Sequence, residues 1–224
     1  MIVLRLIIQT GLWLIAMAFV LLLAAGTPAW PAAWAFIIEI GVLGLMVGLW
    51  LAWRDPDLLA ERLNWRGQAA QANWDRRFVM GVAVGFIVWL ALMGLDAERW
   101  RWSLVPPFLQ GVGVLAIAFS VWMSWRVFMV NSFAAPVVKI QPGQGVIDTG
   151  PYAIIRHPMY AGAVAFFLGA PLMLGSWVGL ALAPFLIAAM AARAVAEERL
   201  LLAELPGYEA YAEKVGYRFV PRLW

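Results

Sequence analysis

The segment Arg156–Glu198 reads RHPMYAGAVAFFLGAPLMLGSWVGLALAPFLIAAMAARAVAEE. It contains two apolar runs, 158–174 and 177–192, separated by Gly175-Ser176, a pair that is typical of a tight turn. The runs predict two antiparallel membrane helices. Each run is short for a full crossing, so a tilted or partly re-entrant hairpin is the alternative interpretation. Because the chain folds back at the turn, we expect the charged residues at the two ends of this hairpin to be neighbours.

The rest of the chain is also mostly apolar. Of its 224 residues, 64% are hydrophobic and 13% are charged, whereas about 25% of the residues of a soluble domain are charged. We therefore expect an all-α integral membrane protein with about six transmembrane helices, five being the alternative. Besides the hairpin, four runs have about the 20 apolar residues that a crossing needs. These runs are Leu6–Ala25, Ala32–Trp53, Phe78–Leu95 and Leu104–Trp125.

The basic residues predict the orientation, because cytoplasmic loops are enriched in Lys and Arg. With the N-terminus in the cytoplasm, only Arg99 and Arg101 fall in outer loops, and 14 of the 16 basic residues are cytoplasmic. This split predicts a multi-pass protein of a bacterial inner membrane with both termini inside. The 14 residues are Arg5, Arg54, Arg62, Arg66, Arg76, Arg77, Arg126, Lys139, Arg156, Arg193, Arg199, Lys214, Arg218 and Arg222.

Residue usage also excludes several kinds of chemistry. The chain has no cysteine, which excludes disulfides, thiolate metal sites and cysteine nucleophiles. Its single histidine, His157, excludes a multi-histidine metal site within one chain, and we expect no bound metal. The net charge of +3 does not indicate nucleic-acid binding, because the basic residues lie at helix ends.

The chain divides into residues 1–130, a region of four membrane helices, and residues 131–224, which we expect to carry the active site. The second region begins with the loop Asn131–Tyr152. Two β-branched runs flank Pro142-Gly143 in this loop, which predicts a small hairpin or a cap.

Two other cytoplasmic segments have their own expected structure. After the hairpin, the sixth helix should continue to about Leu205, break at Pro206-Gly207 and resume over Tyr208–Val215. The arginine-rich segment Arg54–Arg77 should contain a short amphipathic piece that lies on anionic headgroups.

A first polar cluster begins the hairpin. Pro158 suits the first position of a helix, and His157 is biased away from helical dihedrals because it precedes proline. The free N–H groups of such a helix start favour an anion, and Arg156 adds a planar positive group. Tyr160 supplies a ring and a hydroxyl, and Gly162 allows close approach of a ligand or a helix. The alternative is that Arg156 contacts lipid phosphates and His157 only caps the helix.

A second polar cluster ends the hairpin. Arg193 and Glu197 are four residues apart on a helix and can pair, whereas Glu198 points about 100° away. The alternative for this cluster is a solvated helix extension with ordinary ion pairs. Side by side, the two clusters would form an anion site beside a cation site. Such a pair suits a zwitterionic ligand with an additional cationic centre.

Several motifs in order give the chain a family resemblance over residues 131–224. They are Gly150-Pro-Tyr152, Arg156-His-Pro-x-Tyr-x-Gly162, the turn at Gly175-Ser176, Glu197-Glu198, Gly207-Tyr-x-x-Tyr211 and the segment Val215–Pro221, with Asn131 and Gln141 as upstream polar residues. This series resembles the isoprenylcysteine carboxyl methyltransferase family, which is related to the phospholipid N-methyltransferases.

The resemblance implies an integral membrane methyltransferase that uses S-adenosyl-L-methionine. The implied pocket is cytoplasmic and is formed by the C-terminal helical hairpin and its adjoining loops. The implied cofactor-binding residues are Gln141, Tyr152, Arg156, His157, Pro158, Tyr160, Gly162, Glu197 and Glu198. The implied catalytic residues are Arg193, which would hold an anionic acceptor, and His157, which would accept a proton from an amine acceptor. A glutamate is the alternative base for that proton.

The acceptor is expected to be lipophilic and to arrive from the surrounding membrane lipids. It is either a carboxylate, as on a prenylated cysteine, or a lipid amine. One competing function is an NADPH-dependent membrane reductase of the sterol type, although Ala163 follows Gly162 where those enzymes have an acidic residue. Another is a non-catalytic transporter or scaffold, for which only Glu39, inside the second apolar run, gives an indication. A Glu39 that locks two helices together is the alternative for that residue.

Overall fold

A computed structural model describes residues 1–64, 71 and 73–224 of the chain, and every regular element within them is helical. In chain order the elements are α1 (Ile2–Ala25), α2 (Pro31–Arg54), α3 (Pro56–Leu63), α4 (Asn73–Gly94), η1 (Leu95–Arg99), α5 (Pro107–Phe128), η2 (Gly150–Ala153), α6 (Pro158–Leu174), α7 (Trp177–Glu204) and α8 (Tyr208–Lys214).

The prediction of an all-helical membrane fold is confirmed. Among the described residues, five helices are long and apolar enough to cross a membrane, namely α1, α2, α4 together with η1, α5 and α7. The sixth apolar helix, α6, has 17 residues and is therefore about 25 Å long, slightly less than the hydrocarbon thickness of about 30 Å.

The hairpin between Arg156 and Glu198 has the predicted form. Helix α6 covers Pro158–Leu174, and Gly175 adopts a left-handed conformation with a φ of 84°. Ser176 then caps α7, because its hydroxyl accepts a hydrogen bond from the N–H of Gly179 at 2.8 Å. Helix α7 ends at Glu204 and α8 begins at Tyr208, which confirms the predicted break between them.

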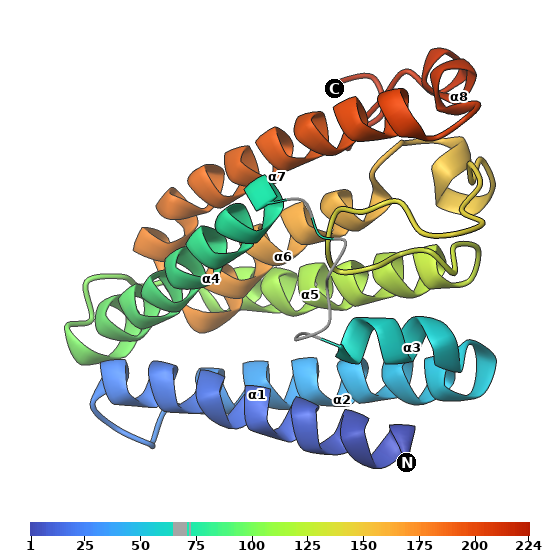
Figure 1. The fold of residues 1–224 in the computed structure, drawn as a ribbon. Helices are drawn as coiled ribbons and strands as arrows, with labels where there is room; N and C mark the ends of the chain where they lie inside the picture. The colour runs from blue at the N-terminus through green and yellow to red at the C-terminus, as the bar shows by residue number, and fades with distance from the viewer. Residues whose placement is uncertain (65–70, 72) are drawn as a thin grey trace.

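The helices form a bundle with two different ends (Figure 1). Three short connections lie at one end: 26–30, 95–106 and the turn between α6 and α7. The N-terminus, α3, the loop after α5 and α8 lie at the other end, where most of the polar contacts are found. We call this second end the polar end.

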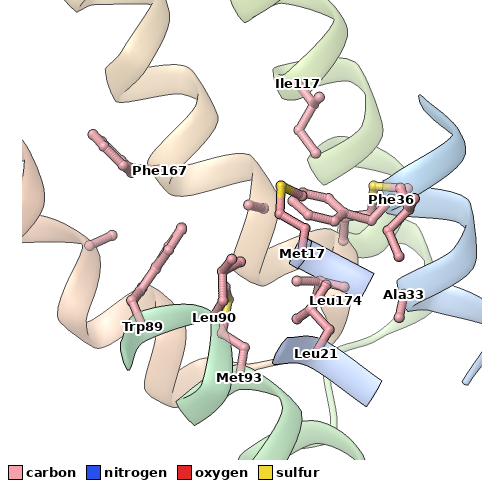
Figure 2. Close-up of a cluster of buried hydrophobic side chains, with 14 of the residues drawn as sticks. Met17, Leu21, Ala33, Phe36, Trp89, Leu90, Met93, Ile117, Phe167 and Leu174 are labelled. Carbon is pink, nitrogen blue, oxygen red and sulfur yellow. The ribbon is translucent and has the colours of Figure 1, made fainter. Parts of the chain in front are cut away.

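A cluster of buried apolar side chains holds the middle of the bundle together (Figure 2). Trp89 of α4 lies edge-on to Phe167 of α6, with ring centroids 5.7 Å apart, and its indole N–H donates to the carbonyl of Gly179 at 2.8 Å. In a membrane the lipid is as apolar as these side chains, so close packing and hydrogen bonds stabilise helix contacts.

Helices α5 and α6 approach each other through glycines. A Cβ atom on Gly113 would lie 2.4 Å from the backbone nitrogen of Met173 and 2.6 Å from the carbonyl oxygen of Gly169. A Cβ on Gly162 would lie 3.2 Å from the carbonyl oxygen of Ser120. Small residues at such crossings are typical of membrane helices. Their effect is to fix the start of α6 against α5.

The loop after α5 is a cap, and the small hairpin that we considered for it is not observed. Residues 131–149 form no strand. The backbone–backbone bonds within the loop are local turns, from Ala135 to Phe133 and from Gln144 to Gln141, and other backbone groups bond to side chains of other elements. Arg62 donates to the carbonyl of Ala134 at 2.8 Å, and Arg193 donates to that of Pro136 at 3.1 Å. We call residues 131–149 the cap loop.

Two other expectations are refined by the structure. The amphipathic piece within 54–77 is α3, whose Leu58 and Leu59 are buried in a core with residues of α1, α2 and α5. Arg66, which we predicted to be cytoplasmic, lies outside the described residues.

Glu39 is half-buried. One of its carboxylate oxygens is buried and has no hydrogen-bond partner in the described part of the chain, so the structure shows no helix-locking bond for that oxygen.

Candidate active site

The start of α6 is fixed by the C-terminal tail. Helix α6 begins at Pro158 with His157 as its N-cap residue, as the sequence predicts. The backbone N–H groups of Arg156 and His157 donate to the carbonyls of Tyr217 and Arg218, both at 2.9 Å. These two amides are therefore not free for an anion. The tail runs beside the motif and holds it in place.

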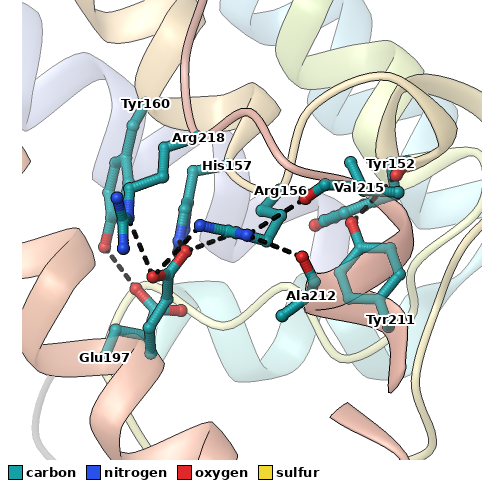
Figure 3. A network of polar contacts seen from close by, with 10 residues as sticks. Tyr152, Arg156, His157, Tyr160, Glu197, Tyr211, Ala212, Val215 and Arg218 are labelled. Atoms are coloured by element: carbon teal, nitrogen blue, oxygen red, sulfur yellow. Dashed lines mark hydrogen bonds and ion pairs between the residues drawn. The ribbon is translucent and has the colours of Figure 1, made fainter. Parts of the chain in front are cut away.

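Glu198 lies at the centre of a buried polar cluster (Figure 3). Its carboxylate accepts hydrogen bonds from Nε of Arg156 at 2.7 Å and from Nε of Arg218 at 2.8 Å, and lies 3.0 Å from Nε2 of His157. Only 5% of Glu198 is exposed. A buried carboxylate is costly unless it is paired and hydrogen-bonded, and here both requirements are met.

Arg156 also ties the cluster to α8. Its Nη1 atom donates to the carbonyl oxygens of Ala212 and Val215, both at 3.0 Å. These carbonyls lie near the C-terminal end of α8, where helix carbonyls lack partners within the helix. Arg156 therefore joins α6, α7 and α8. Together with the contacts of Glu198, this confirms that the two ends of the hairpin are neighbours.

Glu197 belongs to a second and separate arrangement. Its carboxylate accepts a hydrogen bond from the hydroxyl of Tyr160 at 2.7 Å, and the Tyr160 ring stacks on that of His157 with centroids 5.4 Å apart. Among the described residues, no Lys or Arg forms an ion pair with Glu197.

The predicted pairing of Arg193 with Glu197 is wrong. Arg193 pairs with Asp75 at the start of α4, with Nε 2.8 Å from Oδ1. Asp75 is completely buried and also accepts from the backbone N–H of Val138 at 3.0 Å. Ion pairs between residues four apart on one helix are weakened by solvent. A buried carboxylate from another helix is shielded from water and held in place, so it forms the stronger contact.

A cavity of about 170 Å³ lies between these groups, under the cap loop. It is bounded by the cap loop, the start of α6, the last turns of α7 and by α8. Its polar and aromatic lining consists of Asn131, Phe133, Lys139, Gln144, Tyr152, Arg156, His157, Tyr160, Arg193, Glu197, Tyr208 and Tyr211. Members of both charged clusters therefore line one space: Arg156 and His157 of the first, and Tyr160 and Glu197 of the second.

Tyr152 contributes a neutral phenol to this cavity. Its hydroxyl accepts from Nδ2 of Asn131 at 2.8 Å, and its carbonyl accepts from the hydroxyl of Tyr211 at 2.9 Å. Burial raises the pKa of Tyr152 to about 12, so the phenol keeps its proton at neutral pH. Burial also raises the pKa of Tyr211 above its usual value.

Three of the predicted site residues lie differently from the others. Pro158 lines the cavity, but Gln141, Gly162 and Glu198 do not. The Gln141 amide donates to the carbonyl of Phe133 at 2.8 Å and so braces the cap loop. Gly162 lies against α5, and Glu198 lies behind the cavity wall. Their cofactor roles stay predictions, and their visible contacts are structural.

Sequence reasoning missed two charged residues of the site. Arg218 lies within the tail segment 215–221 that carried the family resemblance, so its charge was a usable signal. Asp75 lies next to Arg76 and Arg77 at the start of an apolar run, where an ordinary solvated helix end is equally consistent with the sequence.

The described residues contain no group of three or more His, Asp or Glu side chains that could hold a metal ion. The geometry thus defines a class of protein: a helical membrane protein with a dipolar cavity at one end, bounded by the cap loop, the start of α6, the end of α7 and α8.

Comparisons with known proteins point to the same kind of protein. Residues 109–206 match the model of the phospholipid methyltransferase family, PEMT. The fold is similar to that of a eukaryotic intramembrane Ras methyltransferase, isoprenylcysteine carboxyl methyltransferase (ICMT). The TM-score is 0.57 with 16% identity, over 96% of this chain and 74% of the other. The resemblance drawn from the motifs is therefore confirmed.

A curated relative is also similar in sequence. It is the cobalt-zinc-cadmium resistance protein CzcN of Cupriavidus metallidurans, which is 26% identical over 147 residues. The match covers 65% of this chain, and the chain spans 63% of the length of that relative.

Proposed function

We propose that this protein is an integral membrane methyltransferase that binds S-adenosyl-L-methionine in the cavity under the cap loop and methylates a lipophilic acceptor. Members of the matched family use this cofactor. The observation that carries the proposal is the distribution of charge around the cavity.

One side of the cavity has an excess of positive charge. Two guanidinium groups, those of Arg156 and Arg218, surround the single carboxylate of Glu198, so the cluster has a net charge of +1 when His157 is neutral. The other side has an excess of negative charge, because Glu197 is hydrogen-bonded only to the neutral phenol of Tyr160 among the described residues.

This arrangement fits the cofactor. The amino-acid part of S-adenosyl-L-methionine carries a carboxylate and an ammonium, and its sulfonium adds a further positive charge. Arg156 and His157 line the cavity on the side that favours the carboxylate, and Glu197 lies on the side that favours a cation. The rings of Tyr152, Tyr208 and Tyr211 give the cavity apolar and aromatic surface for a nucleoside.

When bound, the cofactor supplies a methyl group activated by positive sulfur. The protein must orient the acceptor and exclude water. The cap loop covers the cavity, and the low polarity around it favours a reaction in which a carboxylate and a sulfonium lose their charges. Arg193 is placed to hold an anionic acceptor, since its guanidinium lines the cavity 5.8 Å from the Tyr160 ring centroid.

An amine acceptor would first have to lose a proton. His157 was one of the bases that we predicted for this step, but its Nε2 atom is 3.0 Å from the Glu198 carboxylate, which already has two arginine partners. Glu197 faces the cavity with only one hydrogen bond, so we propose it as the base for such an acceptor.

The test is ligand binding by the purified protein in detergent. Wild-type protein should bind S-adenosylhomocysteine and not NADPH, which separates the methyltransferase from the reductase. Glu197→Gln should weaken that binding at least tenfold. Glu213→Gln on the exposed side of α8 is the matched control and should bind as the wild type does. A wild-type protein that binds NADPH, or binds neither ligand, would overturn the proposal.

The acceptor is then found with radiolabelled S-adenosyl-L-methionine and a membrane lipid extract. We expect label in an organic-soluble product. An ester product is released by mild base, whereas a methylated amine is not, so one treatment separates the two acceptor classes.

A further inference from the structure

Asp75 bonds to several parts of the site at once, which a residue that only helps a helix to span the membrane does not need to do. It lies in the first turn of α4, and its carboxylate is completely buried. The carboxylate accepts hydrogen bonds from Arg193 of α7, from the backbone N–H of Val138 in the cap loop and from the side-chain amide of Gln71, at 2.8, 3.0 and 2.9 Å. Three segments that are far apart in the chain thus meet on one group.

The contact with Arg193 reaches the cavity. Held by Asp75, the Arg193 guanidinium also donates to the carbonyl of Pro136 at 3.1 Å and lies over the ring of Tyr160. Tyr160 in turn fixes Glu197, the carboxylate with no cationic partner in the described part of the chain. The orientation of Arg193, and through Tyr160 that of Glu197, therefore depends on Asp75.

The contact with Val138 closes the cap loop. Asp75 accepts from residue 138 of the loop while Arg193 donates to residue 136, so the ion pair holds the loop on both sides of residue 137. Lys139, the next residue, pairs with Glu61 of α3 at 2.6 Å. The middle of the cap loop is thus held by α3 and α4 from one side and by α7 from the other.

Asp75 also lies outside the part of the chain that matches the family, which begins at residue 109. We propose that Asp75 is a positioning residue that orients Arg193 toward the cavity and latches the cap loop over it. The start of α4 is then part of the active site and not only of a membrane anchor. This inference rests on the proposed function for its ligand, and Asp75 itself touches no ligand.

The first test measures the latch without any ligand. Asp75→Asn keeps the shape of the side chain and removes its charge, so Arg193 loses its ionic partner. Hydrogen exchange of the backbone amides in 133–140 should speed up at least tenfold, whereas Asp148→Asn should leave them unchanged. Asp148 is a suitable control because it forms an exposed ion pair with Lys214, with side chains 48% and 69% exposed. Unchanged exchange in Asp75→Asn would overturn the latch, whether or not the wild type binds a cofactor.

The second test asks whether the effect passes through Arg193. Asp75→Asn should weaken S-adenosylhomocysteine binding at least tenfold, and Asp75→Glu, which keeps the charge, should recover part of the loss. In an Arg193→Gln background, Asp75→Asn should weaken S-adenosylhomocysteine binding by less than threefold, because the partner of Asp75 is already absent. Equal losses in both backgrounds would refute the positioning role.

The two proposals fail in different ways. A wild-type protein that does not bind S-adenosylhomocysteine refutes the proposed function, and the exchange experiment still decides the latch. If Asp75→Asn does not fold in detergent, Asp75→Glu replaces it. Because its side chain is longer, the Asp75→Glu variant should show faster exchange of the amides in 133–140 than the wild type. Exchange at the wild-type rate would count against the latch.

Discussion

Replacing Glu198 by glutamine should both destabilise the protein and impair its site. The amide has nearly the shape of the carboxylate but no charge. It would leave the guanidinium of Arg156, whose side chain is 8% exposed, without its anion. It would also remove the anion from Arg218 and change the partner of His157.

The expected magnitude follows from the burial of this cluster. Removing one partner of a buried ion pair typically costs about 3–5 kcal/mol, because the remaining charge stays away from water. For a chain of this size, each kcal/mol corresponds to roughly 2–4 °C in unfolding temperature. Glu198→Gln should therefore lower the unfolding temperature by about 6–20 °C. His157 and Arg156 should also lose the contact that fixes them at the cavity.

The assay is thermal unfolding in detergent, followed by tryptophan fluorescence, together with S-adenosylhomocysteine binding at a temperature where the variant stays folded. Glu213→Gln is again the control, since Glu213 is exposed on α8. An unfolding temperature within about 2 °C of the wild type would show that the cluster is more hydrated than its geometry indicates. A stable variant with full binding would refute the reasoning altogether.

Two further predictions concern packing and pH. Gly113→Ala should destabilise the protein by about 1–3 kcal/mol, because its Cβ would meet α6 backbone atoms at 2.4 Å. Gly111→Ala on the same helix is the control: its Cβ would have no atom within 4 Å, so it should be neutral in the same unfolding assay. Burial raises the pKa of Tyr152 from 10.0 to about 12, so the folded protein holds a proton that the unfolded chain loses. Its contribution to stability is complete below pH 10 and is lost as the pH rises toward 12. Tyr152→Phe should therefore reduce the fall in the free energy of unfolding between about pH 9 and 11, as measured by denaturant titration.

Local features of the site could be predicted from sequence because they depend on neighbouring residues. Proline at position 158 sets the start of α6, and the Gly175-Ser176 turn sets its end, so the helix bounds follow directly. The turn also requires the two ends of the hairpin to meet, which is why His157 and Glu198 could be expected side by side.

The partners of the charged residues could not be predicted in the same way. Arg193 has a possible partner four residues away and another 118 residues away, and sequence spacing favours the near one. The structure selects Asp75 because α4 brings a completely buried carboxylate to α7, and burial strengthens an ion pair that has good geometry. This selection depends on how α4 packs against α7, which no local pattern encodes.

The cap loop illustrates a related limit. Its β-branched residues and its Pro142-Gly143 turn are compatible with a hairpin, but its backbone groups find better-fixed partners in Arg62, Asp75 and Arg193. Charged donors and acceptors form stronger hydrogen bonds than neutral ones, so three such contacts favour the extended, unpaired loop.

These contacts predict that residues 131–224 cannot form the site alone, although this segment carries every motif of the resemblance. Without residues 1–130, Arg193 would lack Asp75, and the cap loop would lack its bonds to α3 and α4. The faces of α6 that pack on Phe36 and Trp89 would also be uncovered. We expect a 131–224 fragment expressed in membranes to show no S-adenosylhomocysteine binding, and co-expression with residues 1–130 to restore it. Binding by the fragment alone would mean that the N-terminal helices only anchor a self-sufficient catalytic unit, and that the contacts of Asp75 contribute nothing to the cavity.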